Sequence, residues 1–482
     1  MRVLVVPEIY RPGDASSSGT LSDAVTWVEQ WLRRDEHLHV YWLLPPRERA
    51  GYDRADVLAD RERVTLVEAE PFLADHPERT AFTEHGYTEA ELTALADAVY
   101  ERGGYVDAVV DQRRTGRVTL QKWLLVHTDH WAADVAPFDL VANVHDLQVP
   151  FKFRYCRYRE RLQMGMELAG AAFADGVWFT AGVDAAAFRE HAADLLAPAL
   201  VEVTLGEAVE AGSPIAFGEF EESYADRPEW LHVAGSLWEK KCADDVLGVA
   251  ETLHERFGVR TVMTSMEAIP EEYAALPWVE TRSEASPAEY RDALSRGDLA
   301  VCASEYETMA RTPFEQAASG QVLLLRDEPW IYDCVPEGYD LVADPGDLEA
   351  LAVRAVERWD EAVAANRRLL DRVREVRSPD ACGRRTYRDL RERVAAKVAA
   401  YDVDRADAPV ERALDDLAGA SDVGFALDEL VARTAEYTDG GRPVTDRETY
   451  SRTDALYALR NLGYEDSGAG EPPEFVRTGR WA

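Results

Sequence analysis

The alternation of strands and helices starts twice along this chain. Short apolar runs alternate with stretches of helical periodicity in the first half, and the same pattern restarts at Trp230. Between them, residues 207–228 are rich in Glu, Gly, Ser, Pro and Asp and have no apolar period. Alternating β and α elements favour a parallel sheet that is covered by helices on both faces. We therefore expect an α/β protein with two Rossmann-like domains, residues 1–206 and 229–385, joined by a linker over 207–228.

Acidic residues outnumber basic ones along the whole chain. The sequence has 90 Asp and Glu against 53 Lys and Arg, a formal net charge of −37, and only five of the basic residues are lysines. Nucleic acids and anionic membranes are bound through basic patches, so this composition argues against both as partners. An acidic, lysine-poor chain is typical of halophiles, where salt near 1 M shortens the screening length to about 3 Å. We expect a halophilic protein that works in molar salt.

Cysteine usage and apolar runs bear on the compartment. The five cysteines are widely spaced and no Cys-x-x-Cys pair occurs, which argues against a disulfide framework and a zinc site. No apolar run approaches the roughly 18 residues that span a membrane. Val3–Val6 is too short for the apolar core of a signal peptide and is typical of a buried strand. We expect a cytoplasmic protein with free thiols and no transmembrane segment.

Two glutamates lie in a strand–loop–helix segment of the second half. An expected strand, Leu299–Ala303, is followed by a loop that contains Glu307 and then by a helix whose first turn contains Glu315. Ligands of parallel sheets bind at the carboxyl ends of the strands. The unpaired N–H groups of a helix start attract phosphate, and carboxylates accept hydrogen bonds from sugar hydroxyls. The segment therefore has the groups that a nucleoside diphosphate sugar needs.

Each glutamate also has an ordinary structural explanation. Thr312-x-x-Glu315 matches a capping box, with Thr312 as the helix cap. A loop carboxylate such as Glu307 is usually just solvated. The combination is more specific than either residue: a strand, a loop, two glutamates eight apart, a proline, and Ala-Ala-Ser-Gly before the next apolar strand. This combination favours a ligand site.

The segment resembles the Glu-x7-Glu segment of retaining GT-B enzymes in glycosyltransferase family 4, the group of sucrose synthase, which is related to glycogen synthase. Glu307 matches the first glutamate of that segment, and Glu315 matches the second. The resemblance implies that Glu307 binds the donor sugar and stabilises charge there, and that Glu315 holds the nucleotide ribose. It places Ala310 and Arg311 beside the donor diphosphate. The family has Gly-Phe-Gly where this chain has Thr308-Met309-Ala310.

A second stretch of the expected nucleotide-binding domain carries the same resemblance. Gly235-Ser236 follows the first strand of that domain, where the family often has Gly-Arg. Lys241 stands six residues after the glycine, as the family's lysine does, and would neutralise the donor diphosphate beside Lys240. A pair of solvated loop lysines is the alternative. The side-by-side placement of two of the chain's five lysines favours donor binding.

The first domain offers two further positions of the same family. His145 follows an expected strand, where the family often has a histidine that faces the donor sugar. A structural histidine is the alternative, and His127 and His130 are rivals on a stretch of helical pattern. Ser18-Gly19 precedes the first helix, at the place of the family's Gly-Gly loop, which touches diphosphate and acceptor. A flexible surface loop is the alternative there.

The resemblance covers about residues 1–400. It implies that 386–402 form helices that cross back to the first domain. Residues 403–482 are mostly polar with helical patches, and we expect a mostly helical extension whose role the sequence does not give.

The resemblance implies a hexosyltransferase-like enzyme that moves a sugar from a nucleotide-sugar to an acceptor hydroxyl with retention of configuration. The acceptor is left open as a glycan, a lipid-linked sugar or a small molecule. No cofactor and no metal are expected, with the nucleotide-sugar as co-substrate. Two alternatives stay open: a catalytically inactive glycosyltransferase-like binding scaffold, which Ser236 and Thr308 favour, and another GT-B enzyme such as an epimerase or a phosphorylase.

Overall fold

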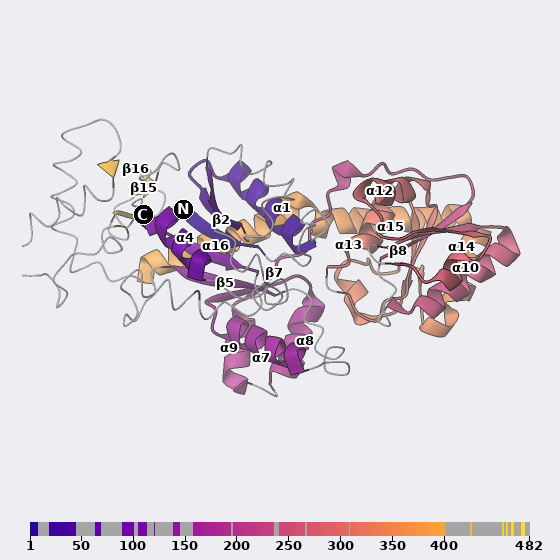
Figure 1. Cartoon of the computed structure of the whole chain (residues 1–482), viewed down its shortest axis with the longest axis horizontal. Coiled ribbons are helices and arrows are strands. Elements are labelled where there is room, and N and C mark those ends of the chain that lie inside the picture. Colours follow the sequence, from indigo (N-terminus) through magenta and orange to yellow (C-terminus); the bar gives the residue numbers. More distant parts are fainter. Residues whose placement is uncertain are drawn as a thin grey trace, which may run out of the picture.

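The protein is described by a computed structural model. It describes residues 1–7, 19–44, 63–68, 89–100, 105–112, 120, 138–144, 158–193, 196–235, 241–265, 268–307, 309–400, 425–426, 456, 459–460, 464–466 and 474–477. Two α/β domains lie side by side, and a small third sheet lies at the far end of the first domain (Figure 1).

The first domain is built on a seven-stranded parallel sheet with the order β3-β2-β1-β4-β5-β6-β7. Its strands are β1 (Arg2–Val6), β2 (His39–Leu44), β3 (Val64–Glu68), β4 (Ala108–Asp111), β5 (Asp139–Val144), β6 (Gly176–Phe179) and β7 (Ala208–Glu210). Its helices are α1 (Gly19–Arg34), α4 (Glu89–Leu95) with the π-helical turn η2 (Ala96–Tyr100), α7 (Tyr158–Ala172), α8 (Gly182–Ala192) and α9 (Pro198–Gly206). The central strands are buried on both faces, as a parallel sheet between helix layers requires.

The second domain repeats this architecture on a six-stranded parallel sheet with the order β10-β9-β8-β11-β12-β13. Its strands are β8 (Trp230–Ala234), β9 (Arg260–Thr264), β10 (Val279–Arg282), β11 (Leu299–Cys302), β12 (Val322–Arg326) and β13 (Val342–Ala343). Its helices are α10 (Ala243–Phe257), α11 (Glu271–Ala274), α12 (Pro287–Arg296), α13 (Arg311–Ala318) and α14 (Leu348–Glu357), with 3-10 turns η3 (Phe217–Glu219), η5 (Pro329–Asp333) and η6 (Pro345–Asp347). The two sheets confirm the expected pair of Rossmann-like domains.

The expected linker differs from the structure at its start. Residues 208–210 form β7, which pairs in parallel with β6 and so belongs to the first sheet. This three-residue strand of half-buried and exposed residues has no apolar run that would reveal it in the sequence. The connection between the domains therefore begins after Glu210.

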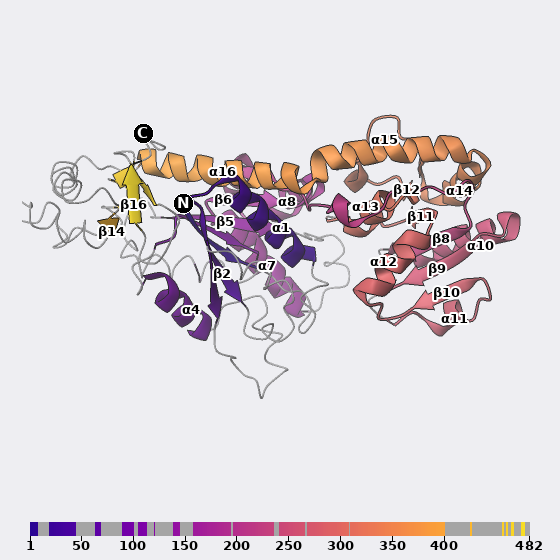
Figure 2. The ribbon, with the colours of Figure 1, turned by 90° about the horizontal axis from the view of Figure 1, so that it is seen from above.

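Two long helices run along both domains (Figure 2). Helix α15 (Trp359–Arg377) packs on the second domain, and α16 (Pro379–Ala400) packs on α1 of the first. Two buried tryptophan N–H groups of the first domain donate to α16: Trp31 to Thr386 at 2.9 Å and Trp178 to Asp389 at 2.6 Å. The chain thus crosses back to the first domain, in a helix that starts at Pro379 rather than at residue 386.

The described part of residues 403–482 covers the amino ends of the first sheet. Strands β14 (Phe425–Ala426), β15 (Tyr464–Asp466) and β16 (Glu474–Arg477) form an antiparallel sheet in the order β14-β16-β15, and Leu456, Leu459 and Arg460 are helical. Within the extension that we expected to be mostly helical, Phe425–Ala426 form a strand instead.

This sheet is anchored by buried ion pairs. Arg2, at the start of β1, bonds Asp466 with an Nε–Oδ2 distance of 2.5 Å, and Arg460 contacts both carboxylate oxygens of Asp107, just before β4. The described part of the extension therefore lies at the edge of the first sheet that is remote from the carboxyl ends of its strands.

No helix in the described part of the chain combines the length and the apolar character that crossing a membrane requires.

Gly320 ends the turn after α13 in a conformation that only glycine adopts easily, with φ +88°. A Cβ there would lie 2.0 Å from the carbonyl oxygen of Ser223. We predict that Gly320→Ala lowers the free energy of unfolding by roughly 3 kcal/mol, because backbone must move to relieve the clash. Gly346→Ala is the control, since a Cβ there meets no atom within 4 Å, and it should change stability by less than about 0.5 kcal/mol. Equal effects of the two in chemical denaturation would contradict this account.

Candidate functional site

The loops that follow β8 and β11 meet at the carboxyl edge of the second sheet. Lys241 Nζ donates a hydrogen bond to Glu307 Oε1, although the two residues are 66 positions apart in the chain. Both side chains are largely buried, at 26% and 12% exposure. The structure therefore brings together the two residues that the sequence marked independently as the centre of a donor site.

Helix α13 begins one residue earlier than expected. Arg311 is its first residue, and Ala310 before it adopts a left-handed conformation, with φ 44° and ψ 36°, and makes no side-chain cap. The predicted capping box is therefore wrong: Thr312 lies inside the first turn, too late to act as the cap. The Glu315 carboxylate turns elsewhere: it accepts a hydrogen bond from Tyr290 Oη at 3.0 Å and pairs with Arg311 at 3.4 Å.

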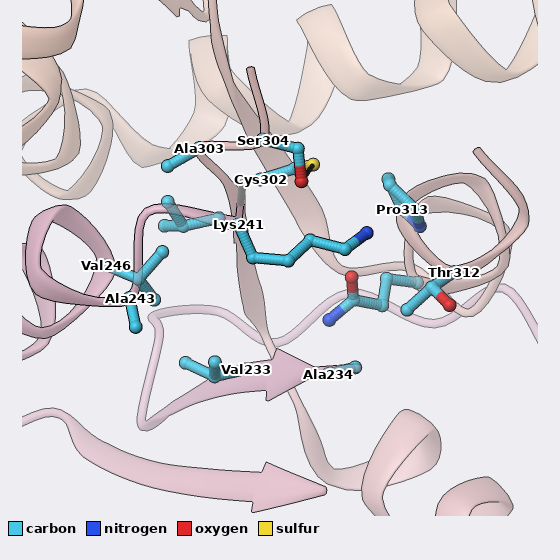
Figure 3. Close-up of a pocket in the computed structure, with 12 residues that line it drawn as sticks. Val233, Ala234, Lys241, Ala243, Val246, Cys302, Ala303, Ser304, Thr312 and Pro313 are labelled. Atoms are coloured by element: carbon cyan, nitrogen blue, oxygen red, sulfur yellow. Dashed lines mark hydrogen bonds between the residues drawn. The ribbon is translucent and has the colours of Figure 1, made fainter. Parts of the chain in front are cut away.

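The head of α13 and Lys241 surround a small pocket (Figure 3). The Lys241 side chain extends across it toward the first turn of α13, with Ser304 and Thr312 on either side. The volume of this pocket is about 30 Å³, enough for about one or two water molecules. Unpaired N–H groups at a helix start and an ammonium group together favour an anion. The pocket therefore has the chemistry of a phosphate site, with Glu307 as the present partner of its cation.

Buried polar groups hold α13 from behind. The Gln316 amide donates to the carbonyl of His232 on β8 at 2.8 Å, and the His232 ring lies 2.8 Å from Thr264 Oγ1 and 3.2 Å from Gln321 Nε2. His232 is fully buried. Burial lowers the pKa of His232 to about 3, so the ring is neutral at ordinary pH.

Groups of the first domain reach the same segment. Gly19, the first residue of α1, faces α13, and a Cβ on it would lie 2.8 Å from Met309 Cε. The Arg311 guanidinium pairs with Asp23 of α1 at 2.7 Å as well as with Glu315. The Arg311 guanidinium is thus paired with two carboxylates. Only the backbone N–H of Arg311 remains suited to contact the donor diphosphate, the role that the sequence suggested.

Four predicted site residues, His145, Ser18, Ser236 and Lys240, lie outside the described residues. Gly235 is described: it follows β8 with φ +104°, a conformation that requires glycine even though a Cβ there would meet no atom within 4 Å.

Sequence reasoning missed Asp23, Tyr290 and Tyr306 at this site, since no local pattern marks them. Among the described residues, no group of three or more His, Cys, Asp or Glu side chains could hold a metal ion.

Comparison with known proteins bears on the fold alone. No protein-family model matches the chain, and no curated protein matches it significantly in sequence. Among solved structures, sucrose-phosphate synthase of Thermosynechococcus elongatus is similar at a TM-score of 0.57 and 14% identity, over 82% of this chain and 99% of that one. TarM gives 0.56 and 8%, over 81% and 98%. HepE of Anabaena, in complex with UDP-glucose, gives 0.54 and 10%, over 81% and 100%. The chain therefore has the GT-B fold of these proteins.

The buried His232 should make the protein acid-sensitive. An unfolded histidine takes up a proton as the pH falls below about 6.5, whereas the folded ring stays neutral down to about pH 3, so acidification favours unfolding. We predict that His232→Asn lowers stability at pH 7 but removes this proton uptake. The stability gap to the wild type should then narrow by about 1.4 kcal/mol per pH unit well below pH 6.5. Urea denaturation from pH 7 to 5 measures the gap, and parallel pH profiles would contradict the assignment.

Proposed function

We propose that this protein transfers a sugar from a nucleotide-sugar donor to an acceptor hydroxyl, with retention of configuration. The observation that carries the proposal is the meeting of Lys241 and Glu307 at the head of α13. Similar structures support a nucleotide-sugar as co-substrate, since HepE was solved in complex with UDP-glucose and also with UDP. The family resemblance of the Glu307–Glu315 segment supports retention.

Donor binding at this site has to exchange partners. The diphosphate would take the ammonium of Lys241 and the first N–H groups of α13, and so would compete with Glu307 for the same cation. Glu307, released from Lys241, would then accept hydrogen bonds from the sugar. Glu315, which Tyr290 and Arg311 hold in place, would accept from the ribose hydroxyls.

The transfer step needs little acid–base chemistry from the protein. In retaining transfer the acceptor oxygen attacks the anomeric carbon on the face from which the diphosphate departs. The bond from that carbon to the diphosphate oxygen breaks, and the proton of the acceptor hydroxyl passes to the departing diphosphate. The protein contributes positioning and charge: Lys241 and the start of α13 stabilise the leaving group without a metal ion.

The acidic composition supports an assay in molar KCl. Long-range attraction between the protein and a diphosphate would be screened under those conditions, so binding would depend on short contacts at Lys241 and the helix start. The acidic, lysine-poor composition favours a halophilic, cytoplasmic enzyme.

One observation favours a second candidate, a glycosyltransferase-like scaffold that binds a glycan or a partner and catalyses no sugar transfer. Both described cations at the site are paired with carboxylates, Lys241 with Glu307 and Arg311 with Asp23 and Glu315. If these pairs do not open, no diphosphate enters. Nucleotide binding separates the two candidates.

We predict that UDP stabilises the protein in a thermal-shift assay in molar KCl, run beside GDP, ADP and dTDP. Lys241→Met should weaken binding of the stabilising nucleotide by at least about tenfold, because a charge-assisted contact is lost. Lys397→Met is the matched control: that lysine contacts Asp139 at 2.6 Å, at the start of β5, and should leave the affinity unchanged. Stabilisation by none of the four nucleotides would contradict the enzyme and favour the scaffold.

We further predict opposite effects of Glu307→Gln on binding and transfer. Removal of the carboxylate frees Lys241 for the diphosphate, so nucleotide affinity should hold or rise several-fold. The rate of sugar transfer should fall by at least about 100-fold, because charge at the sugar is no longer stabilised. Isothermal titration and product analysis measure the two effects, and full transfer activity would remove Glu307 from the mechanism.

A further inference from the structure

Two side-chain hydrogen bonds connect the segment that carries both glutamates to the first domain. We call them the two grips. Tyr306, directly before Glu307, donates its hydroxyl hydrogen to Asp184 Oδ1 at 3.0 Å. Arg311, the first residue of α13, donates to Asp23 Oδ1 at 2.7 Å. Asp23 lies in α1 and Asp184 in the first turn of α8, so both acceptors belong to the first domain. In Figure 1, α13 lies at the junction of the two domains, beside α1.

Both acceptor carboxylates are buried. Asp23 is 2% exposed, Asp184 is fully buried, and the Tyr306 side chain is 8% exposed. A buried carboxylate is costly unless hydrogen bonds or an opposite charge compensate it, so each of these side chains depends on its partner in the other domain. Loss of one partner leaves the buried carboxylate less well compensated and favours separation of the two surfaces.

Two cations and one hydroxyl group surround Asp23. Arg311 of α13 faces it, the hydroxyl of Ser213 in the interdomain connection donates to it at 2.9 Å, and Arg377 at the end of α15 is a further nearby cation. Burial raises the pKa of Asp23 to about 6 in spite of these groups, so the carboxylate is charged at neutral pH. Arg377 also donates to the carbonyl of Met309, which ties the middle of the segment to the same place.

Each grip acts next to one glutamate. The Tyr306–Asp184 bond fixes the residue before Glu307, and the Arg311–Asp23 pair fixes the side chain that also holds Glu315. The second domain supplies the backbone of the segment, and the first domain supplies the partners that fix its two ends. The contacts that fix its two ends therefore exist only when the domains are in contact.

We propose that Asp23 and Asp184 are positioning residues, which hold the Glu307–Glu315 segment in its donor-binding geometry across the domain interface. The consequence for binding rests on the proposed function, but the grip itself does not. Two carboxylates that touch no donor atom thereby set the donor affinity, because separation of the domains releases both ends of the segment.

Hydrogen–deuterium exchange of the full chain in molar KCl tests the grip without any ligand. Asp23→Asn, Asp184→Asn and the milder Tyr306→Phe should each speed exchange of peptides within 299–320 by at least about tenfold. Asp389→Asn is the matched control, since Asp389 is also a buried carboxylate but bonds Trp178 and Arg393 away from the segment. Unchanged protection in all three variants, or an equal loss in the control, would overturn the proposal.

A second readout separates this proposal from the proposed function. If the wild-type protein binds UDP, Asp23→Asn and Asp184→Asn should each raise the Kd for UDP about tenfold. Asp389→Asn should leave that Kd unchanged. Asp184→Asn combined with Tyr306→Phe should be no worse than either alone, because both remove one interaction. An unaltered Kd in both aspartate variants would overturn the positioning role. If the wild type binds no UDP, the proposed function is weakened, and the exchange experiment alone decides the grip.

Discussion

The place where α13 begins determines the geometry of the candidate site. The left-handed conformation of Ala310 starts the helix at Arg311, so that the first turn lines the pocket and Arg311 reaches two carboxylates. A start at Thr312 would have given Glu315 to a capping box. With the observed start, the Glu315 carboxylate instead contacts Tyr290 and Arg311. The order of the parallel strands also contributes to the site, because β8 and β11 are neighbours and the loops after them lie at the same edge of the sheet.

This edge has no excess of positive charge among its described residues, so an anion can bind there only by replacing a carboxylate as the partner of a cation. The chain carries a net charge of −37, and the described cations at the site already have carboxylate partners. A diphosphate must therefore replace a carboxylate, as it would when it takes Lys241 from Glu307. Such an exchange changes the number of close ion pairs little, which suits a site in high salt, where only short contacts remain strong. The same pairing connects the domains, since Arg311 belongs to one domain and Asp23 to the other.

The sequence predicted the fold well where periodicity is strong and poorly where strands are short. The buried strand expected at Val3–Val6 lies within β1, the second domain restarts at Trp230 with β8, and the strand expected at Leu299–Ala303 occurs as β11. Strands β3, β7, β10 and β13 were missed because they are short or only partly buried, as in the half-buried Val279–Arg282 of β10. Lys241 and Glu307 were each chosen from local pattern and resemblance. The pair of Asp23 and Arg311, 288 positions apart, has no local signal, because only the approach of two domains creates it.

The described residues of the extension lie away from this edge, at the amino ends of β1 and β4, where Arg2 and Arg460 form buried ion pairs. The groups that we propose to contact the donor belong to the second domain, and Asp23 and Asp184 of the first domain hold them in place. A crystal structure of the full chain with UDP in molar KCl tests this account most directly. The account predicts the diphosphate against Lys241 and the first N–H groups of α13, the ribose hydroxyls within hydrogen-bond distance of Glu315, and Lys241 separated from Glu307. UDP bound elsewhere, with the pair of Lys241 and Glu307 intact, would contradict it.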